Sequence, residues 1–357
     1  MSEAYVDVVA IEKELQKLWA DMGAQKGQTE AVTRACVHNL IVYAPGERSD
    51  AEVNAVVADV TVQNPGRVFI VLPDPSSSEK KSNAWVSAQC YRTSGTRQQV
   101  CCEQIMIRAL GDAVKELASI LAPLTIPDLP TFVWWRAPLT QKPPFEDLLE
   151  FADRTIVDTA LDHNENLRDV AQILIRNIPE CALTDLNWAR LTIWRELVAR
   201  LFDAPDAKHQ LREINQIEIS AERPFSFRPL FLASWFGSRL RWKVSSKVQK
   251  HGTNVQFQCV NNVNRPVEVL IKKREHSEVH RNLESVKIQT ESTAFFVHRT
   301  EESFHVEASA LATGKIFCSE DRKAHPQSEA DLLRTEVQIL GRDNAYEQAL
   351  QFLDSIL

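Results

Sequence analysis

Tryptophan and arginine are concentrated in two short blocks of this 357-residue chain. The first block is Phe132-Val133-Trp134-Trp135-Arg136, and the second runs from Leu186 to Leu197. Trp and Arg are among the residues most enriched at binding hot spots, so the blocks indicate recognition chemistry. The candidate partner-binding residues are Trp134, Trp135, Arg136, Arg190 and Arg195.

Reaction chemistry has few candidates in this sequence. The chain has no GxGxxG or Walker-type loop for a nucleotide phosphate, no HExxH pair for zinc and no GxSxG nucleophile turn. Glycine is scarce, at 10 of 357 residues, and phosphate-binding loops need glycine for close backbone approach. The nine histidines are scattered without the spacing of metal ligands. We therefore expect no catalytic residues, no cofactor and no metal.

Seven cysteines are spread along the chain without CxxC spacing, and most are expected to be small buried hydrophobic residues. Cys90 and Cys101 are different, because a hairpin centred on Gly95-Thr96 pairs residues whose numbers sum to 191. Their Cα atoms would lie ~5.5 Å apart in a hydrogen-bonded pair. This spacing permits a strained cross-strand disulfide that is redox-labile.

The elements that must position the first block alternate between helices and strands. Periodicity and turn residues predict a helix at 7–22, a strand at 34–43, a helix at 50–62, a strand at 68–72, a hairpin at 84–108, a helix at 112–121, a strand ending at 135, a helix at 145–151 and a strand at 155–157. Such alternation predicts a sheet with parallel members, covered on both faces. The polar segment 162–166 follows, so an N-terminal α/β domain with a mixed sheet is placed at 1–162.

Trp134 and Trp135 are neighbours in the strand that ends the first block. Adjacent strand residues point to opposite faces of a sheet, so both rings cannot enter the same core layer. We therefore expect one ring to lie at a strand end, against a loop, a pocket or a partner.

The second half of the chain predicts a domain at 163–357 in which helices pack on an antiparallel sheet. Helices are expected at 167–177, 187–202, 228–240 and 329–357, the last with a break near Gly341, and strands between 216 and 308. The chain as a whole is therefore expected to be mixed, α/β in its first domain and α+β in its second.

The helix expected at 187–202 carries an apolar stripe within an arc of about 140°. The stripe consists of Trp188, Leu191, Trp194, Val198, Leu201 and Phe202. It is expected to face a core. Arg195 projects between members of the stripe, and a buried guanidinium is costly unless it is paired. Arg195 is therefore expected to meet a carboxylate or backbone carbonyls, or to face a ligand or a partner.

Charge and hydropathy limit the partners. A net charge of -7 argues against nucleic-acid binding, although Arg239-Leu240-Arg241-Trp242-Lys243 and Lys272-Lys273-Arg274 are basic. No apolar run approaches the ~18 residues of a membrane span. The first ten residues are acidic and unlike a signal peptide, so a cytoplasmic location is expected.

Several blocks in combination carry a resemblance to one protein family. They are Cys102-Glu103-Gln104-Ile105, Pro127-Asp128-Leu129-Pro130, Trp134-Trp135-Arg136, Ala152-Asp153-Arg154, Asp185-Leu186-Asn187-Trp188-Ala189-Arg190-Leu191 and Trp194-Arg195-Glu196-Leu197. With them the chain resembles the glucose-6-phosphate dehydrogenase assembly protein family, OpcA. The likeness is strongest over 100–202 and weakest in the β-rich part after residue 243.

The resemblance implies a protein that is not an enzyme, but that associates with glucose-6-phosphate dehydrogenase and favours its active oligomer. It also implies redox regulation linked to thioredoxin, as in cyanobacterial members. The redox candidates are Cys90, Cys101, Cys102, Cys259 and Cys318. The family's pattern of closely spaced cysteines near the C-terminus is not present here, which leaves Cys259 and Cys318 as distant candidates.

A sugar-phosphate-binding protein or enzyme is the alternative that the same blocks allow. Trp rings stack on sugars, and Arg136, Arg190 or Arg195 could bind a phosphate with two hydrogen bonds. A deep pocket joining Trp135 to Arg195 would favour this alternative.

Overall fold

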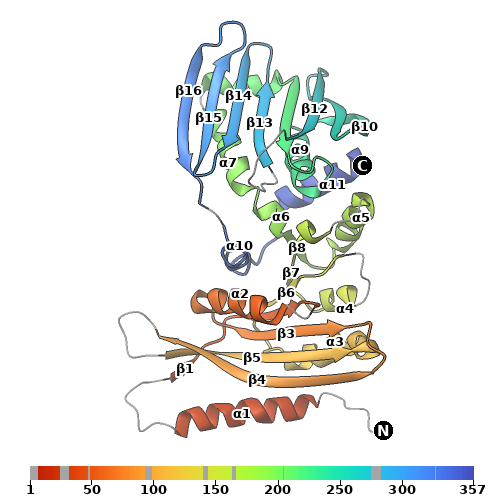
Figure 1. Ribbon diagram of the computed structural model, residues 1–357, viewed down its shortest axis with the longest axis vertical. Coiled ribbons are helices and arrows are strands. Elements are labelled where there is room, and N and C mark those ends of the chain that lie inside the picture. The colour runs from red at the N-terminus through yellow and green to blue at the C-terminus, as the bar shows by residue number, and fades with distance from the viewer. Residues whose placement is uncertain are drawn as a thin grey trace. The chain divides into compact units, whose positions relative to one another are not determined.

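The computed structural model describes residues 7–24, 32–46, 49–92, 99–139, 144–162, 166–203, 205–274, 283–325 and 327–357. It contains two compact units, each assembled from three separate segments (Figure 1). The first unit comprises 1–162, 177–186 and 328–342, and the second comprises 163–176, 187–327 and 343–357. Each unit contains helices and one sheet, so the mixed fold class expected from the sequence is confirmed.

The first unit contains an eight-stranded sheet in the order β1-β5-β3-β2-β6-β7-β8, with β4 paired to β5. The strands are β1 (Val32–Arg34), β2 (Asn39–Tyr43), β3 (Arg67–Asp74), β4 (Lys81–Arg92), β5 (Gln99–Leu110), β6 (Thr131–Trp135), β7 (Arg154–Val157) and β8 (Ala182–Asp185). β4 is antiparallel to β5, and the other pairs are parallel. This is the mixed sheet that the sequence predicts.

Helices cover both faces of the inner strands of this sheet. They are α1 (Val8–Ala24), α2 (Ser49–Gln63), η1 (Gly111–Glu116), α3 (Leu117–Leu121), η2 (Ala122–Leu124), α4 (Phe145–Leu149), η3 (Thr159–Leu161) and α10 (Glu329–Glu336). Every residue of β2 and of β6 is buried, as in a parallel sheet that is packed on two sides. At the start of η1, Gly111 has a φ of 54°, and a Cβ there would lie 2.5 Å from the carbonyl oxygen of Glu79, so the turn requires glycine.

The second unit contains an eight-stranded sheet in the order β10-β11-β12-β9-β13-β14-β15-β16. The strands are β9 (Gln216–Ala221), β10 (Lys243–His251), β11 (Asn254–Val260), β12 (Pro266–Lys273), β13 (Leu283–Gln289), β14 (Thr293–Arg299), β15 (Ser303–Ala310) and β16 (Ile316–Lys323). β9 and β12 are parallel, and all other pairs are antiparallel. The antiparallel sheet expected from the sequence thus gains one parallel pair.

Helices of the second unit cover one face of its sheet. They are α5 (Leu167–Asn177), α6 (Leu186–Ala189), α7 (Thr192–Leu201), α8 (Pro205–Lys208), η4 (His209–Arg212), α9 (Phe227–Arg239) and α11 (Asn344–Ile356). Figure 1 shows α7, α9 and α11 along this sheet, and α7 contacts β14 and β15 while α9 contacts β9. Buried and half-buried residues alternate along β9 and β15, as expected when only one face is covered.

Four strands are absent from the sequence expectations, and one helix differs. The strand expected at 34–43 is interrupted at residues 35–38, which separates β1 from β2, and β8, β10 and β16 are additional strands. The helix expected at 187–202 is interrupted at residues 190–191, which separates α6 from α7. The apolar stripe survives this break, because all six of its members are buried. The hairpin turn at Gly95-Thr96 lies outside the described residues.

Candidate functional site

Trp134 and Trp135 are both completely buried in the first unit. Trp135 lies at a strand end as expected, but the expectation that this ring would meet a pocket or a partner outside the main core is wrong. β6 is an inner strand between β2 and β7, so each of its faces is covered and each ring has its own core layer. Neither ring is accessible to a partner of this unit in the described structure.

Trp135 and Tyr43 flank the crevice at the carboxyl ends of β6 and β2. These two residues end their strands, are paired in the sheet register and stack with ring centroids 3.9 Å apart and an interplanar angle of 4°. Phe145 packs edge-on against Trp135, with centroids 5.0 Å apart. Burial raises the pKa of Tyr43 to about 12. Aromatic side chains therefore fill this end of the sheet.

The strand order of the first unit makes that crevice informative. Without β1 and β4, the order β5-β3-β2-β6-β7-β8 is the 3-2-1-4-5-6 order of dinucleotide-binding sheets, in which the cofactor lies outside the carboxyl ends of the first and fourth strands. Here those strands are β2 and β6. The turn after β2 reads Ala44-Pro45-Gly46-Glu47-Arg48-Ser49-Asp50, with one glycine and two carboxylates where a pyrophosphate would need backbone N–H groups. These residues do not fit a dinucleotide.

Arg136 holds the segment 328–342 instead of facing solvent. Its guanidinium lies over the Trp134 ring, 4.9 Å from the centroid, and its Nη2 is 3.1 Å from Oε2 of Glu329. Glu329 begins α10, which also contacts α2. Arg136 therefore attaches a late segment of the chain to the first unit, and only 16% of its side chain is exposed.

Arg154 attaches the same segment more deeply. It starts β7, its side chain is 1% exposed, and its Nη2 donates to Oε2 of Glu336 at 2.6 Å. Its Nη1 donates to the carbonyl oxygen of Gly341. A buried ion pair of this kind is costly to break, because either partner alone would remain as an uncompensated charge. The block Ala152-Asp153-Arg154 thus has a structural task.

The second Trp/Arg block has an equivalent role in the second unit. Trp188 is buried, and its indole N–H donates to Oδ2 of Asp343 at 2.8 Å. Asp343 also caps α11 by accepting from the backbone N–H groups of Ala345 and Tyr346. The Tyr346 ring packs against Trp188 in turn. The C-terminal helix is thereby fixed to this block.

Arg195 and Arg190 are half-buried, as is Arg136, whereas Trp134 and Trp135 are completely buried. The Arg195 guanidinium lies over the Trp188 ring, 3.6 Å from its centroid, and donates to Oγ1 of Thr192 at 3.0 Å. The helix break moves Arg195 off the buried stripe, and the face of the ring supplies part of its stabilisation. Of the five candidate partner-binding residues, the described structure leaves the three arginines partly accessible, and Arg136 is the one whose guanidinium is held by Glu329.

A buried carboxylate network in the first unit was not expected from the sequence. Glu103 on β5 is fully buried, and it accepts from Nε of Arg67 at 2.6 Å and from the Trp19 indole N–H at 2.6 Å. Arg34 lies 2.7 Å from the same carboxylate. Trp19 belongs to α1, so the network attaches the N-terminal helix to the sheet. The only sequence signal was a charged residue within an apolar strand.

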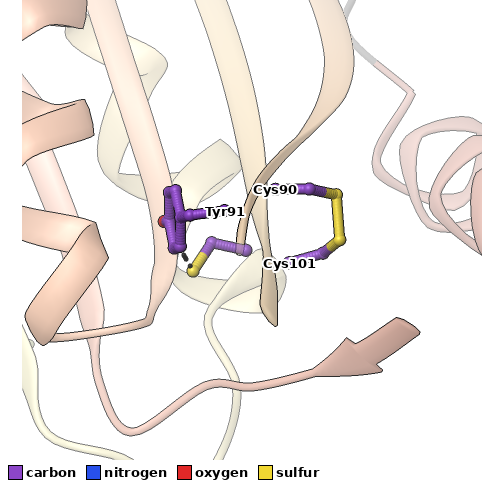
Figure 2. The surroundings of a disulfide bond; sticks show 4 residues. Cys90, Tyr91 and Cys101 are labelled. Atoms are coloured by element: carbon purple, nitrogen blue, oxygen red, sulfur yellow. Dashed lines mark hydrogen bonds between the residues drawn. A yellow bond between two sulfur atoms is a disulfide. The ribbon is translucent and has the colours of Figure 1, made fainter. Parts of the chain in front are cut away.

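Cys90 and Cys101 form a disulfide across the β4–β5 hairpin, shown in Figure 2. The pairing by numbers that sum to 191 is confirmed, but the Cα atoms are 4.0 Å apart and not ~5.5 Å. This is the close spacing of a non-hydrogen-bonded pair. The Cys101 carbonyl oxygen accordingly accepts from the N–H of Ala35, on the side of β5 away from β4.

The other redox candidates are single thiols. Cys102 is buried beside the disulfide, where the Tyr91 hydroxyl donates to its sulfur, and burial raises its pKa (Figure 2). Burial also raises the pKa of Cys259 to about 12. Cys318 is exposed on β16. Cys259 lies on β11, six strand spacings from β16 or roughly 29 Å away, so these two cysteines cannot bridge within one chain.

Asp162, near the carboxyl end of β7, carries a buried carboxyl group. Its Oδ1 accepts from the N–H of Leu139 at 3.3 Å, and its Oδ2 has no hydrogen-bond partner. Burial, together with the negative charge of Asp158, raises its pKa from 3.8 to about 6. The folded state therefore binds a proton more readily than the unfolded chain between these two pH values. Stability attributable to Asp162 is present below pH 4 and is lost as pH rises through about 6.

Replacing Asp162 with asparagine should therefore stabilise the protein at pH 7, by roughly 1–3 kcal/mol, and change little at pH 4. Asparagine keeps the oxygen that accepts from Leu139 but carries no charge. Burial lowers the pKa of His38 to about 4. His38 therefore makes stability rise with pH, the opposite of Asp162, and it does so equally in the wild type and in the Asp162→Asn protein. Denaturant unfolding of both proteins from pH 4 to pH 7 checks the prediction. A difference that does not change with pH would contradict it.

Among the described residues, no group of three or more His, Cys, Asp or Glu side chains could hold a metal ion. No helix in the described part of the chain is long and apolar enough to cross a membrane.

The fold and these contacts define a class of protein. It has a dinucleotide-type sheet with stacked aromatic residues at the carboxyl ends of its central strands, joined to a unit built on a second, largely antiparallel sheet. Its Trp/Arg blocks hold late segments of the chain in place.

The chain belongs to the glucose-6-phosphate dehydrogenase subunit family, OpcA. Residues 57–173 match the model described as "Glucose-6-phosphate dehydrogenase subunit N-terminal domain", and residues 181–350 match the corresponding C-terminal domain. The resemblance found from the sequence blocks is thereby confirmed.

Curated relatives carry the name "Putative OxPP cycle protein OpcA". The protein from Synechocystis is 33% identical over 63% of this chain and 47% of its own length. The protein from Nostoc punctiforme is 30% identical over 58% of this chain and 45% of its own length. The chain thus spans about half the length of these relatives.

Among solved structures, the transcriptional regulator Gal80p from Kluyveromyces lactis shares the fold. It has a TM-score of 0.50 and 10% identity, over 86% of this chain and 84% of that chain. Levoglucosan dehydrogenase in complex with NADH has a TM-score of 0.48 and 10% identity, over 91% of this chain and 96% of that chain, a likeness too low to bear on function.

Proposed function

We propose that the chain is a non-catalytic assembly factor that binds glucose-6-phosphate dehydrogenase in the cytoplasm and favours its active oligomer, in support of the oxidative pentose phosphate pathway. The observation that carries this proposal is the aromatic packing at the crevice of the first unit. Tyr43 and Trp135 stack at the carboxyl ends of β2 and β6, the two strands that flank the dinucleotide site in this strand order, so we infer a scaffold without cofactor chemistry. The family's description as a subunit of that dehydrogenase supports the choice of partner.

The physical mechanism is linkage between two equilibria. A protein that binds the active oligomer more tightly than the inactive forms shifts the population toward the active oligomer, by an amount set by the ratio of the two affinities. Neither catalytic residues nor a cofactor is needed for this effect. Affinity for the dehydrogenase must therefore depend on its oligomeric state.

Arg195 and Arg190 are the proposed anchors for the partner. Both are half-buried at the start of α7, and arginine supported by an aromatic ring is typical of binding hot spots. Trp188 holds the Arg195 guanidinium in place before binding, which reduces the entropy lost when a partner binds. Trp134, Trp135 and Arg136 act in folding and not at this surface.

Replacing Arg195 with alanine should weaken binding of the dehydrogenase about tenfold or more, as expected for a hot-spot arginine. Thermal stability should fall only modestly, because the half-buried Arg195 loses its contact with the face of the Trp188 ring while Trp188 itself stays in place. Sedimentation of the labelled chain with the dehydrogenase measures the affinity. Arg265→Ala is the matched control, since this exposed arginine of the second unit pairs only with exposed Glu291 among the ion pairs identified. Equal loss in both variants, or in neither, would contradict the assignment.

Redox control through the Cys90–Cys101 disulfide is part of the proposal. Cys90 is exposed at the surface of β4, where a dithiol such as that of thioredoxin can reach it. The same sedimentation assay should then respond to a dithiol reductant in the wild type and in Cys318→Ser. The Cys90→Ser protein should give one affinity under both conditions. If the affinity still changed with reductant in the Cys90→Ser protein, the redox control would act through other cysteines.

Sugar-phosphate binding is the second candidate, favoured only by the accessible arginine pair Arg190 and Arg195. The expected Trp135 platform cannot serve, because Tyr43 covers one face of its ring and the residue is buried. A thermal shift with glucose 6-phosphate that disappears in the Arg195→Ala protein would establish this role in place of partner binding.

A further inference from the structure

The outer edge of β4 is unlike every other long outer strand of the two sheets. Natural proteins protect exposed strand edges with charged side chains, bulges or short length, because an open edge pairs with other chains. β10 carries three lysines and two register shifts, β16 carries four charged residues and one register shift, and β8 has only four residues. These edges therefore follow the usual pattern of protection.

β4 has none of these protections. It has 12 residues and pairs with β5 from end to end without a register shift. The ten residues from Ser82 to Tyr91 contain no charged side chain. No other strand in the described part of the chain pairs with β4. The strand is thus long, regular and uncharged along its free edge.

The disulfide geometry shows which backbone groups face that edge. Cys90 and Cys101 are a non-hydrogen-bonded pair, so the N–H and C=O groups of Cys90 point away from β5. Because the pattern alternates along an antiparallel ladder, the same groups of Ser82, Ala84, Val86 and Ala88 also point outward. These residues form a row of outward-facing backbone donors and acceptors with which another extended strand can pair.

Trp85 adds an apolar contact beside this row. Half of its surface is exposed, whereas five of the other tryptophans are buried. Its partner in the register, Met106, is half-buried on the same face of the hairpin. The α1 helix contacts β4 on the opposite face, where Trp19 donates to Glu103. The Trp85 face of the edge is therefore suited to cross-strand packing with an incoming strand.

We propose that β4 is a self-association edge, at which β4 of a second copy of this chain pairs antiparallel across a two-fold axis and joins the two first-unit sheets. An uncharged strand can meet its own copy without the like-charge repulsion that the three lysines of β10 would impose. A two-fold axis also closes the assembly, since each free edge is used once and no open fibre results. This pairing does not depend on the dehydrogenase.

Sedimentation equilibrium and light scattering over a concentration series test the proposal on the full chain. Ala88→Pro removes an outward N–H and leaves the bonds to β5 intact, whereas Ser87→Lys places a charge on the exposed face of the same edge. Each change acts twice across the axis, so the dimer dissociation constant should rise about tenfold or more. Ser319→Lys, on the outer strand β16, is the matched control and should remain dimeric.

Hydrogen exchange supplies a readout that folding defects cannot imitate. As the concentration of the wild type rises, the outward amides of Ala84, Val86 and Ala88 should become protected. The amides of Trp85 and Ser87, which face β5, should be protected at every concentration. A wild type that stays monomeric, or a dimer that survives in Ser87→Lys, would overturn the proposal.

Discussion

Replacing Arg154 with methionine should lower the free energy of unfolding by about 3–5 kcal/mol, the cost expected when one member of a buried ion pair is removed. Methionine fills most of the space of the arginine stem, but the Glu336 carboxyl group would remain nine-tenths buried without its partner. The Gly341 carbonyl oxygen would lose its donor as well. Chemical denaturation measures the change, and hydrogen exchange should show it first in the segment 328–342.

The double variant Arg154→Met with Glu336→Leu distinguishes a lost charge pair from a misfolded unit. Replacing both members of a buried pair by apolar residues is commonly neutral or stabilising, so the double variant should recover most of the loss. Arg265→Ala provides the surface control, since its pair with Glu291 is more than half exposed and should contribute under about 1 kcal/mol. An Arg154→Met protein as stable as the wild type would show that this pair does not hold the segment.

Replacing Trp135 with alanine should cost about 3–5 kcal/mol, because it removes a completely buried ring and leaves a cavity. The cavity lies where β2 and β6 end. It leaves without a partner the faces of Tyr43 and Phe145 that pack on the Trp135 ring in the wild type. Thermal and denaturant unfolding measure the change. Trp135→Phe keeps an aromatic ring against Tyr43 and should recover part of it.

The same variant separates a core role from a partner-binding role. Below its melting temperature, the Trp135→Ala protein should bind the dehydrogenase as the wild type does, since the ring lies inside the unit. Trp85→Ala, at a half-exposed ring of the same unit, should change the free energy of unfolding by less than about 1 kcal/mol. Normal stability with lost binding in Trp135→Ala would instead make Trp135 a surface anchor.

The family signature thus acquires a structural meaning. Arg136 and Arg154 hold α10 against the first unit, and Trp188 fixes the cap of α11 in the second unit. Residue types that are enriched at protein interfaces serve here at internal contacts between segments far apart in the chain. A contact between distant segments resembles a protein interface, because in both cases a large surface is joined through few polar groups.

Local periodicity was sufficient to predict much of the fold. The apolar stripe from Trp188 to Phe202 is buried as expected, because a helical repeat reports the covered face whether or not the helix is continuous. The pairing of Cys90 with Cys101 followed from hairpin symmetry alone. The apolar stripe and the cysteine pairing could both be predicted because each depends on a short, continuous stretch of sequence.

The features that the sequence did not reveal depend on contacts between distant segments. Burial of both Trp134 and Trp135 required knowing that β6 is an inner strand, which is set by β2 and β7 on either side. β8 is four residues long, too short for a periodic signal. The partners of Arg154 and Glu103 lie 182 and 36 residues away, and no local pattern names them.

The most direct test of the central claim is the kinetics of glucose-6-phosphate dehydrogenase at increasing concentrations of the purified chain, with the mass of the enzyme followed in the same samples. We expect the apparent affinity for substrate and the fraction of active oligomer to rise together and to saturate at the same concentration, because linkage ties them to one binding event. The chain alone should show no turnover with glucose 6-phosphate and a nicotinamide cofactor. An enzyme whose oligomer and kinetics do not respond, or turnover by the chain itself, would contradict the account.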